Sequence, residues 1–477
     1  MWYPVSRLIV HESLVSYICP EDLMKDMKIF AISLGCAKNS IDTELILGAL
    51  CAEGRAHVVE CEDEADVILI NTCGFLESAV QESIDAILQV AQYKRDSQLL
   101  SVTGCMVQRY GSDLERALPE VDLFHGARQP ERMAEKIIDR FSALDTGSPA
   151  HDGENSAHAV KISGISPDAL VSGRLVTTPP WRAFVKIAEG CSNRCTYCLI
   201  PSIRGPLACR AVDEIVDEIG QLTSRGVREV TLLSQDLTSY RYGQADLAAL
   251  VKEVVEQTDL PWLRLLYLHP AGITPGLLRI MEENPDRICP YLDIPIQHAS
   301  SDVLRRMGRG YGAEDLHELF GRIRDALPHA ALRTTVMVGF PGETQDDFQR
   351  LLSFVERWRF MHLGCFVYSD EEGCSARRFS GKVDREVAEG RKTRIMEVQA
   401  RISQELNREF VGTRQKVLVE GLSEETELLL AGRTMFQAVE VDGITYIADG
   451  TADAGDIVEV EITDSHVYDL AGQIVGA

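Results

Sequence analysis

Three cysteines lie close together in the stretch AEGCSNRCTYCLIPSIRGP, residues 188–206. Cys191, Cys195 and Cys198 are four and three residues apart, so one loop can present their thiolates to one metal centre. Structural zinc sites and ferredoxin-type clusters usually take four ligands, and Cys209 follows only after the SIRGP segment, so it is not counted. Three thiolates on a four-iron cluster leave one iron open to a small molecule. The alternatives are a zinc loop completed by a remote ligand and cysteines that are simply buried.

A second set of three cysteines is spread along the chain. Cys36, Cys73 and Cys105 each end an apolar run, in AISLGC, VILINTC and LSVTGC. Because the carboxyl ends of parallel strands share one edge of a sheet, these thiols should converge there, next to positive helix N-termini. Three separately buried cysteines are the alternative. The remaining cysteines considered show no such pattern: Cys19, Cys51, Cys61, Cys289 and Cys365.

The elements that must position these cysteines divide the chain into an α/β multidomain protein. Residues 27–145 alternate short apolar runs with helical periods, which predicts a doubly wound parallel sheet. Six such units within 180–410 predict a partial βα barrel, since a closed one usually has eight. Residues 411–477 read as short strands separated by Gly and Asp turns, which predicts a small all-β barrel. Gly, Ser, Pro and Ala dominate 146–179, which predicts a linker or a segment that wraps over the surface.

Composition limits the class of protein. The chain has 477 residues, too many for one core, and no apolar run long enough to span a membrane. A net charge of −25 argues against a general nucleic-acid binder. Residues 1–26 lack the pattern of a secretory signal, and we expect them to be a disordered extension before a natural start at Met24 or Met27. Without an export signal, the thirteen cysteines are expected to be reduced.

The spacing Cys-x-x-x-Cys-x-x-Cys at the end of the first predicted barrel strand resembles the signature of the radical S-adenosylmethionine (SAM) superfamily. The resemblance implies that the open iron chelates SAM, whose cleavage gives a radical that abstracts an unactivated hydrogen. It also implies that Tyr197 lies near the adenine, with simple packing as the alternative. The GFPGE segment resembles a SAM-contacting segment, which implies contacts from Gly339, Gly342 and Glu343; a tight turn is the alternative.

Nearly the whole chain resembles the radical SAM methylthiotransferases. The similar segments are SLGCAKNSIDTE, NTCGFLESA, VTGCMVQRY, KIAEGCSNRCTYCLIPSIRG, LLSQDLTSYRYG, DIPIQHAS, MVGFPGET and VYDLAG. The resemblance implies two four-iron four-sulfur clusters. Cys191, Cys195 and Cys198 would hold the radical SAM cluster. Cys36, Cys73 and Cys105 would hold an auxiliary cluster that carries a methylated sulfur. SAM would serve as methyl donor and as radical source, with an external electron donor.

The motifs most resemble the branch that modifies the β-carbon of an aspartate in the twelfth small-subunit ribosomal protein. SLGCAKNSIDTE, CTYCLIPSIRG and YSDEEG carry this likeness, although Ala37 replaces the usual Pro and Cys374 the usual Thr. The C-terminal barrel, called TRAM in the family, usually binds RNA. Residues 411–477 hold three Lys or Arg and thirteen Asp or Glu, a net charge of −10. That charge suits a basic protein partner better than RNA, unless it is an ordinary solvated surface.

The sequence therefore predicts a bacterial cytoplasmic enzyme, a monomer that binds neither membrane nor stably nucleic acid. One rival is a transfer RNA methylthiotransferase acting on a modified adenosine next to the anticodon. The other is a non-catalytic iron–sulfur or zinc carrier. Four residues at predicted strand ends could face the barrel mouth: Gln235, Asp236, Gln297 and His298. Arg204 and Arg210 could hold the SAM carboxylate or the acidic substrate. Each could instead be a structural or surface residue.

Overall fold

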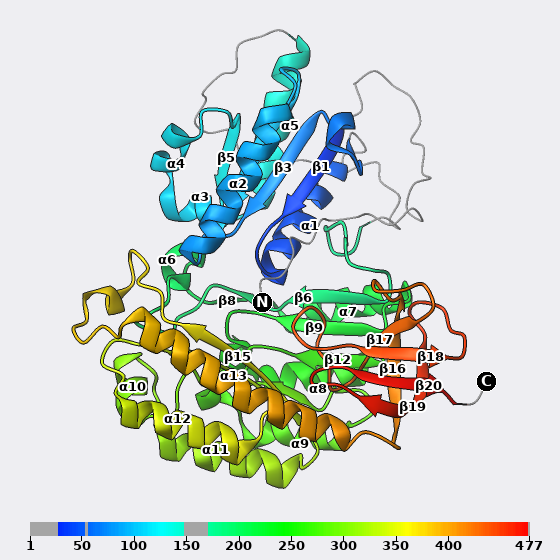
Figure 1. Ribbon diagram of the computed structural model, residues 1–477. Helices are drawn as coiled ribbons and strands as arrows, with labels where there is room; N and C mark the ends of the chain where they lie inside the picture. The colour runs from blue at the N-terminus through cyan, green and yellow to red at the C-terminus, as the bar shows by residue number, and fades with distance from the viewer. Residues whose placement is uncertain (1–26, 53–55, 147–169, 476–477) are drawn as a thin grey trace. The chain divides into compact units, whose positions relative to one another are not determined.

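The computed structural model describes residues 27–52, 56–146 and 170–475. The expected extension over 1–26 and most of the expected linker, 147–169, lie outside the described residues. The chain divides into two compact units, Met1–Pro179 with Leu199–Pro206, and Pro180–Cys198 with Leu207–Ala477. Figure 1 colours the chain by residue number.

The first unit is built on a five-stranded parallel sheet of order β2-β1-β3-β4-β5, as the alternating pattern predicted. Its strands are β1 (Met27–Ser33), β2 (Ala56–Val58), β3 (Val67–Thr72), β4 (Leu99–Gly104) and β5 (Leu123–Gly126). Its helices are α1 (Ala37–Cys51), η2 (Glu62–Glu64), α2 (Glu77–Tyr93), α3 (Cys105–Tyr110), α4 (Ser112–Ala117), α5 (Glu131–Thr146) and α6 (Ile200–Arg204).

Helices cover both faces of this sheet. Ile68 and Ile70 of β3 join the apolar cluster that includes residues of α2, α3 and α4, whereas Val67 and Leu69 join the cluster with α1 and α5. Every residue of β3 and β4 is buried. A central parallel strand is covered on both sides for this reason and is therefore mainly apolar; in β3 the polar residues, Asn71 and Thr72, stand at the carboxyl end.

The second unit contains two parallel three-stranded sheets, of order β12-β9-β6 and β13-β14-β15. Their strands are β6 (Arg182–Lys186), β9 (Glu229–Leu233), β12 (Trp262–Leu265), β13 (Tyr291–Asp293), β14 (Ala331–Val338) and β15 (His362–Val367). A single parallel bridge, Leu263 to Ile288, extends β12 toward β13. The six strands confirm the predicted partial barrel.

Helices separate the successive strands of this partial barrel. They are α7 (Val212–Ser224), α8 (Leu247–Gln257), α9 (Pro275–Glu283), α10 (Ser301–Arg306), α11 (Ala313–Ala326), α12 (Gln345–Trp358) and α13 (Arg385–Arg408). Short elements lie in the loops: β7 (Ala188–Glu189), β8 (Ala208–Cys209), η3 (Leu237–Ser239), β10 (Arg241–Tyr242), β11 (Ala245–Asp246), η4 (Pro270–Gly272) and η5 (Ser375–Arg378). No helix in the described ranges combines the length and apolar content that crossing a bilayer requires.

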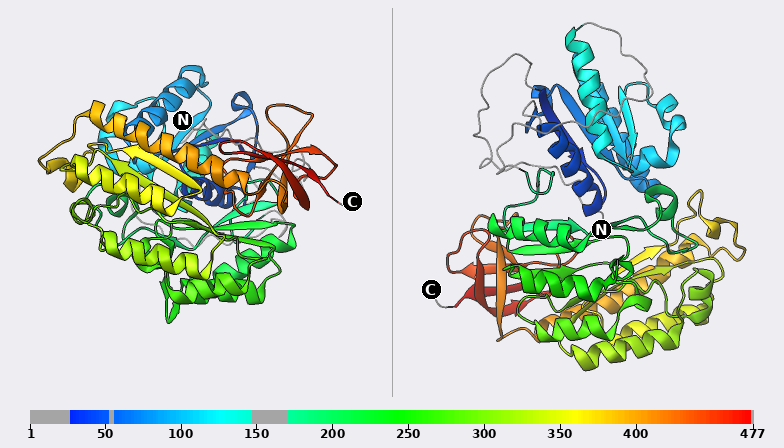
Figure 2. Two further views of the ribbon diagram at one scale, coloured as in Figure 1. Left: turned by 60° about the horizontal axis from the view of Figure 1, so that its bottom comes forward. Right: turned by 180° about the vertical axis from the view of Figure 1, so that it is seen from behind.

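The end of the chain forms a closed five-stranded barrel of order β16-β17-β18-β20-β19. Its strands are β16 (Arg414–Leu422), β17 (Leu430–Thr434), β18 (Thr445–Asp449), β19 (Ile457–Ser465) and β20 (Leu470–Ile474). Alternate residues such as Val417, Val419, Val460 and Ile462 fill its interior. Figure 2 shows the barrel in red beside the green part of the same unit.

A buried charge network ties this barrel to the parallel strands. Glu229 of β9 accepts hydrogen bonds from Arg264 of β12 and Arg433 of β17, both at 2.5 Å, and all three side chains are buried. Arg433 also pairs with Glu420 of β16 at 2.5 Å. Burial acts to raise the pKa of Glu229, but the two guanidinium groups outweigh it and lower the pKa to about 2.

Replacing Glu229 should therefore destabilise the second unit. In Glu229→Gln, Arg264 stays buried without a carboxylate partner among the described residues, and such losses cost about 3–5 kcal/mol. Because the folded-state pKa lies below the unfolded value of about 4.3, the stabilisation is present above pH 4 and lost as pH falls toward 2. Urea unfolding between pH 7 and pH 3 measures both effects.

The exposed pair Lys252–Glu256 on α8 provides the control. Glu256→Gln should change unfolding little at any pH, because solvent screens an exposed pair. Equal unfolding midpoints for Glu229→Gln and the unmodified chain at pH 7 would contradict the stabilising role of the network.

Candidate functional site

The first unit brings Cys36, Cys73 and Cys105 to the carboxyl ends of β1, β3 and β4, which are neighbours in the sheet. Cys36 is exposed, Cys73 is half-buried and Cys105 is buried. Burial raises the pKa of the Cys105 thiol to about 12; Arg204 opposes this, and Cys36 and Cys73 add to it. Cys36 and Cys73 thus lie near enough to Cys105 for their charges to influence its ionisation.

Glycines permit this close approach. Gly35, with φ of +97°, brings its backbone to where a Cβ atom would lie 3.0 Å from Cys73 Cβ. A Cβ on Gly74 would lie 2.6 Å from the carbonyl carbon of Cys105. Side chains at either position would therefore push the strand ends and their cysteines apart.

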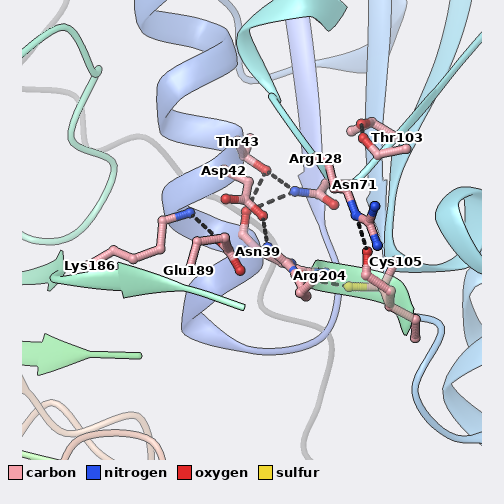
Figure 3. Close-up of polar contacts among 12 residues, drawn as sticks. Asn39, Asp42, Thr43, Asn71, Thr103, Cys105, Arg128, Lys186, Glu189 and Arg204 are labelled. Carbon is pink, nitrogen blue, oxygen red and sulfur yellow. Dashed lines mark hydrogen bonds and ion pairs between the residues drawn. The ribbon is translucent and has the colours of Figure 1, made fainter. Parts of the chain in front are cut away.

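A buried polar network lies beside Cys105 (Figure 3). Asn39 Nδ2 donates to the carbonyl oxygens of Leu34 at 2.8 Å and Thr72 at 3.1 Å, which aims Asn39 Oδ1 the other way. That oxygen accepts from Arg204 Nη2 at 2.5 Å and lies 3.7 Å from Cys105 Sγ. Asn71 Nδ2 donates to the Asn39 carbonyl oxygen at 2.8 Å.

Arg204 comes from α6, far along the sequence. Its Nη1 pairs with Asp42 Oδ2 at 2.5 Å, and both side chains are almost fully buried. The sequence suggested that Arg204 could hold the SAM carboxylate or an acidic substrate; the observed partners are Asp42 and Asn39. Neither partner was predicted. The available signal was the polar run KNSID on a helix that packs against the sheet, where apolar residues are the rule.

Residues 170–179, in the segment expected to be a linker or to wrap over the surface, pack on the same unit. Arg174 forms an ion pair with Glu44 of α1, and Thr177 donates to Glu44 from its backbone N at 2.8 Å and its hydroxyl at 2.9 Å. A buried carboxylate thus fixes the segment.

In the second unit, Cys191, Cys195 and Cys198 follow β7 in one loop, and all three are half-buried. Arg309 Nη1 donates to Cys195 Sγ at 3.4 Å, and its Nη2 donates to the Pro295 carbonyl at 2.8 Å. Burial raises the pKa of Cys191, and the nearby Asp236 and Cys195 raise it further.

The loop has further backbone anchors around Tyr197. Thr196 N donates to the Met307 carbonyl oxygen at 2.9 Å, and Ala376 N donates to that of Thr196 at 2.9 Å. Tyr197 packs edge-on against Phe340 with ring centroids 6.5 Å apart, and burial raises its pKa well above the usual range. The cysteine loop and the GFPGE segment are therefore in contact.

The GFPGE segment turns sharply after β14. Gly339 and Gly342 have φ of +75° and +87°, in the region that favours glycine. The Glu343 carboxylate is turned inward, where it accepts from the Gly339 and Phe340 backbone N–H groups and pairs with Arg391 at 3.3 Å. Contact of these residues with SAM stays a prediction, and Glu343 orients the turn.

His298 is one of the strand-end candidates, and it faces Glu343. His298 Nδ1 accepts from Ser300 N at 2.9 Å, so the proton lies on Nε2, 3.6 Å from Glu343 Oε1. Both residues are buried. His298 and Arg391 thus both face the Glu343 carboxylate, which holds the turn.

The remaining candidate residues each make different contacts. Asp236 accepts from Asn193 of the cysteine loop at 2.9 Å, and Gln235 donates to Glu189 at 2.9 Å. Arg210 pairs with Glu218 at 2.6 Å. Gln297 has φ of +67° and forms a backbone bridge to Val336. Of these, Asp236 is the one that contacts the cysteine loop directly.

The donor sets suit a multi-iron group better than a single ion. Each unit presents three thiols in one neighbourhood, yet no group of three or more His, Cys, Asp or Glu side chains in the described ranges is arranged around one ion. In a four-iron cluster each thiolate binds a different iron, so the sulfurs need not meet at one point. The cationic Arg204 and Arg309 beside the thiols suit an anionic group.

Three family models match successive parts of the chain. The radical SAM superfamily matches residues 185–355, the uncharacterized protein family UPF0004 matches 28–126, and the TRAM domain matches 411–475. The matched ranges cover both cysteine triplets and the C-terminal barrel.

Curated relatives match at nearly full length. The ribosomal protein uS12 methylthiotransferase RimO of Desulfotalea psychrophila is 44% identical over 454 residues, covering 94% of this chain and 99% of the relative. The proteins of the same name from Pelobacter propionicus and Geobacter sulfurreducens are 45% and 44% identical, covering 94% of this chain and 98% of each relative.

Solved structures share the fold. The radical S-adenosylmethionine methyltransferase TsrM from Kitasatospora setae, with cobalamin and a [4Fe-4S] cluster bound, matches with a TM-score of 0.53 at 15% identity, over 72% of each chain. Its complex with tryptophan and a SAM analogue gives a TM-score of 0.52 at 15% identity, over 72% of this chain and 73% of that chain. This likeness concerns the fold alone.

The close approach at Gly74 can be tested directly. Gly74→Ala should force the start of α3 away from β3, at a cost of about 1–3 kcal/mol, and should reduce the iron retained by the first unit. Gly220→Ala on α7 is the matched control, because nothing lies within 4 Å of its added carbon; it should stabilise slightly. Thermal unfolding and iron content would be measured for both. Wild-type iron content and unfolding temperature in Gly74→Ala would contradict this account of the site.

Proposed function

The chain belongs to the ribosomal protein uS12 methylthiotransferase family, and we propose that it replaces a β-carbon hydrogen of an aspartate in that ribosomal protein with a methylthio group. The observation that carries this proposal is the identity of about 44% to proteins of this activity over 94% of the chain. The reaction would take place in the bacterial cytoplasm, with an external electron donor.

SAM and iron–sulfur clusters are the cofactors of this enzyme. When bound, they supply radical formation at SAM and a sulfur atom for transfer, chemistry that amino-acid side chains cannot provide. We assign Cys191, Cys195 and Cys198 to the cluster that binds SAM, and Cys36, Cys73 and Cys105 to the auxiliary cluster. Each set offers three thiolates, which leaves one iron of each cluster open.

The protein's own groups hold and orient these ligands. Arg309 donates to Cys195, and Asp236 holds Asn193 in the same loop. Tyr197 packs edge-on against the buried Phe340, so the cysteine loop and the turn at Gly339 and Gly342 are held together. We expect SAM to bind beside Tyr197 and this turn, whose backbone N–H groups Glu343 holds.

The C-terminal barrel supports a protein substrate. Its net charge of −10 would repel RNA phosphates and attract a basic ribosomal protein. Arg433 is buried with Glu229 and Glu420, so one of its three cations is already neutralised within the fold. Stable RNA binding is therefore not expected. Separately, we expect the protein to be a monomer.

Mass spectrometry of the twelfth small-subunit ribosomal protein tests the proposal. Cells lacking this gene should lose the methylthio increment on the aspartate peptide, and complementation should restore it. An unmodified peptide in cells that carry the gene would contradict the assignment. In that case methylthioadenosine in transfer RNA digests would identify the RNA-modifying rival, and its absence would favour a carrier.

Iron analysis of cysteine variants tests the two ligand sets. The reconstituted chain should bind about eight irons, and the triple alanine variant of either set about four. Alanine at Cys191, Cys195 and Cys198 should abolish SAM cleavage. The triple variant of the other set should cleave SAM without transferring a methylthio group. Cys61→Ala, at an exposed thiol in η2's N-cap position, is the control and should keep all iron.

A further inference from the structure

Helix α6 belongs to the first unit although its sequence follows the second cysteine set. Arg128 fixes it there, with Nη2 donating to the Ser202 carbonyl oxygen at 2.8 Å and Nε to that of Ile203 at 3.2 Å. Gly205, with φ of +84°, then turns the chain away. The helix ends in Arg204, whose guanidinium is directed to the polar network under Cys105 (Figure 3).

The contribution of the Arg204–Asp42 ion pair to folding stability does not explain why the pair is buried. Arg204 is 4% exposed and Asp42 is 2% exposed, so both charges lose their hydration. A buried ion pair of this kind often contributes no more than well-packed apolar side chains would. The pair between α1 and α6 is costly to keep buried, which suggests a role for the charge itself.

The charge of Arg204 acts on the cysteines. Cys105 Sγ and Arg204 Nη2 share Asn39 Oδ1 as a partner, and the orientation of Asn39 is fixed from its other side. The cation is thus separated from the Cys105 sulfur by a single amide oxygen. Asp42, paired with the same guanidinium, partly cancels its field.

We propose that Arg204 is a positioning residue of the auxiliary site, whose positive charge favours the reduced form of the cluster held by Cys36, Cys73 and Cys105, and that Asp42 moderates this effect. The proposal rests on the proposed function, because it assumes that these cysteines hold a cluster. Reduction adds negative charge to a cluster, so a nearby cation raises its reduction potential and a nearby carboxylate lowers it.

The test measures the reduction potential of the auxiliary cluster alone. Cys191, Cys195 and Cys198 are first replaced by alanine, the chain is reconstituted with iron and sulfide, and the reduced cluster is titrated by electron paramagnetic resonance. Arg204→Gln should make reduction at least tenfold less favourable, which is 59 mV for one electron. Asp42→Asn should shift the potential in the opposite direction, because it removes a negative charge that offsets Arg204.

Controls separate charge from packing. Arg204→Lys keeps the charge and should keep the potential near that of the parent, even if thermal stability falls. Arg128→Lys loosens the same helix, because one ammonium cannot reproduce both donations of the guanidinium, but keeps the positive charge; it should leave the potential nearly unchanged.

Two outcomes would overturn the proposal. One is equal potentials, or shifts of the same sign, for Arg204→Gln and Asp42→Asn; the other is a full shift in Arg128→Lys. If Arg204→Gln does not fold, the direction of the shift in Asp42→Asn still decides the sign of the effect. A parent variant that binds no iron would instead refute the assignment of these cysteines under the proposed function.

Discussion

The carboxyl ends of parallel strands lie along one edge of a sheet, and the first candidate site depends on that constraint. β1, β3 and β4 are adjacent and parallel, so residues 36, 73 and 105 meet although long segments separate them. The glycines at 35 and 74 then allow the strand ends to approach. A mixed or antiparallel sheet would have sent at least one of these cysteines to the opposite edge.

The three thiols of each cysteine set are brought together in a different way. One relies on tertiary structure, with one thiol from each of three strand ends. The other relies on local sequence, with three thiols in one loop that is then anchored by Thr196 and Arg309. Each has an arginine beside a cysteine, but Arg204 is neutralised by Asp42, whereas the partners of Arg309 are neutral groups and a thiol.

Periodicity was enough to predict the parallel sheet, the six-stranded partial barrel and the small β-barrel, because burial forces apolar residues into recurring positions. The meeting of three cysteines followed from the same reasoning. Ion-pair partners could not be predicted, since Asp42 and Arg204 are 162 residues apart and Glu229 and Arg433 are 204 apart. The inward turn of Glu343 also escaped prediction, because a motif does not reveal which way its carboxylate points.

The place where the chain passes from one unit to the other has a consequence for how the protein can be divided. Cys198 is the last residue of one segment of the second unit, and Leu199 opens the short return to the first. A fragment that ends at Pro179 therefore lacks the helix that carries Arg204, and the complementary fragment carries that helix without the sheet it packs on. The segments of the two units alternate along the sequence, so a single cut in the chain cannot separate one complete unit from the other.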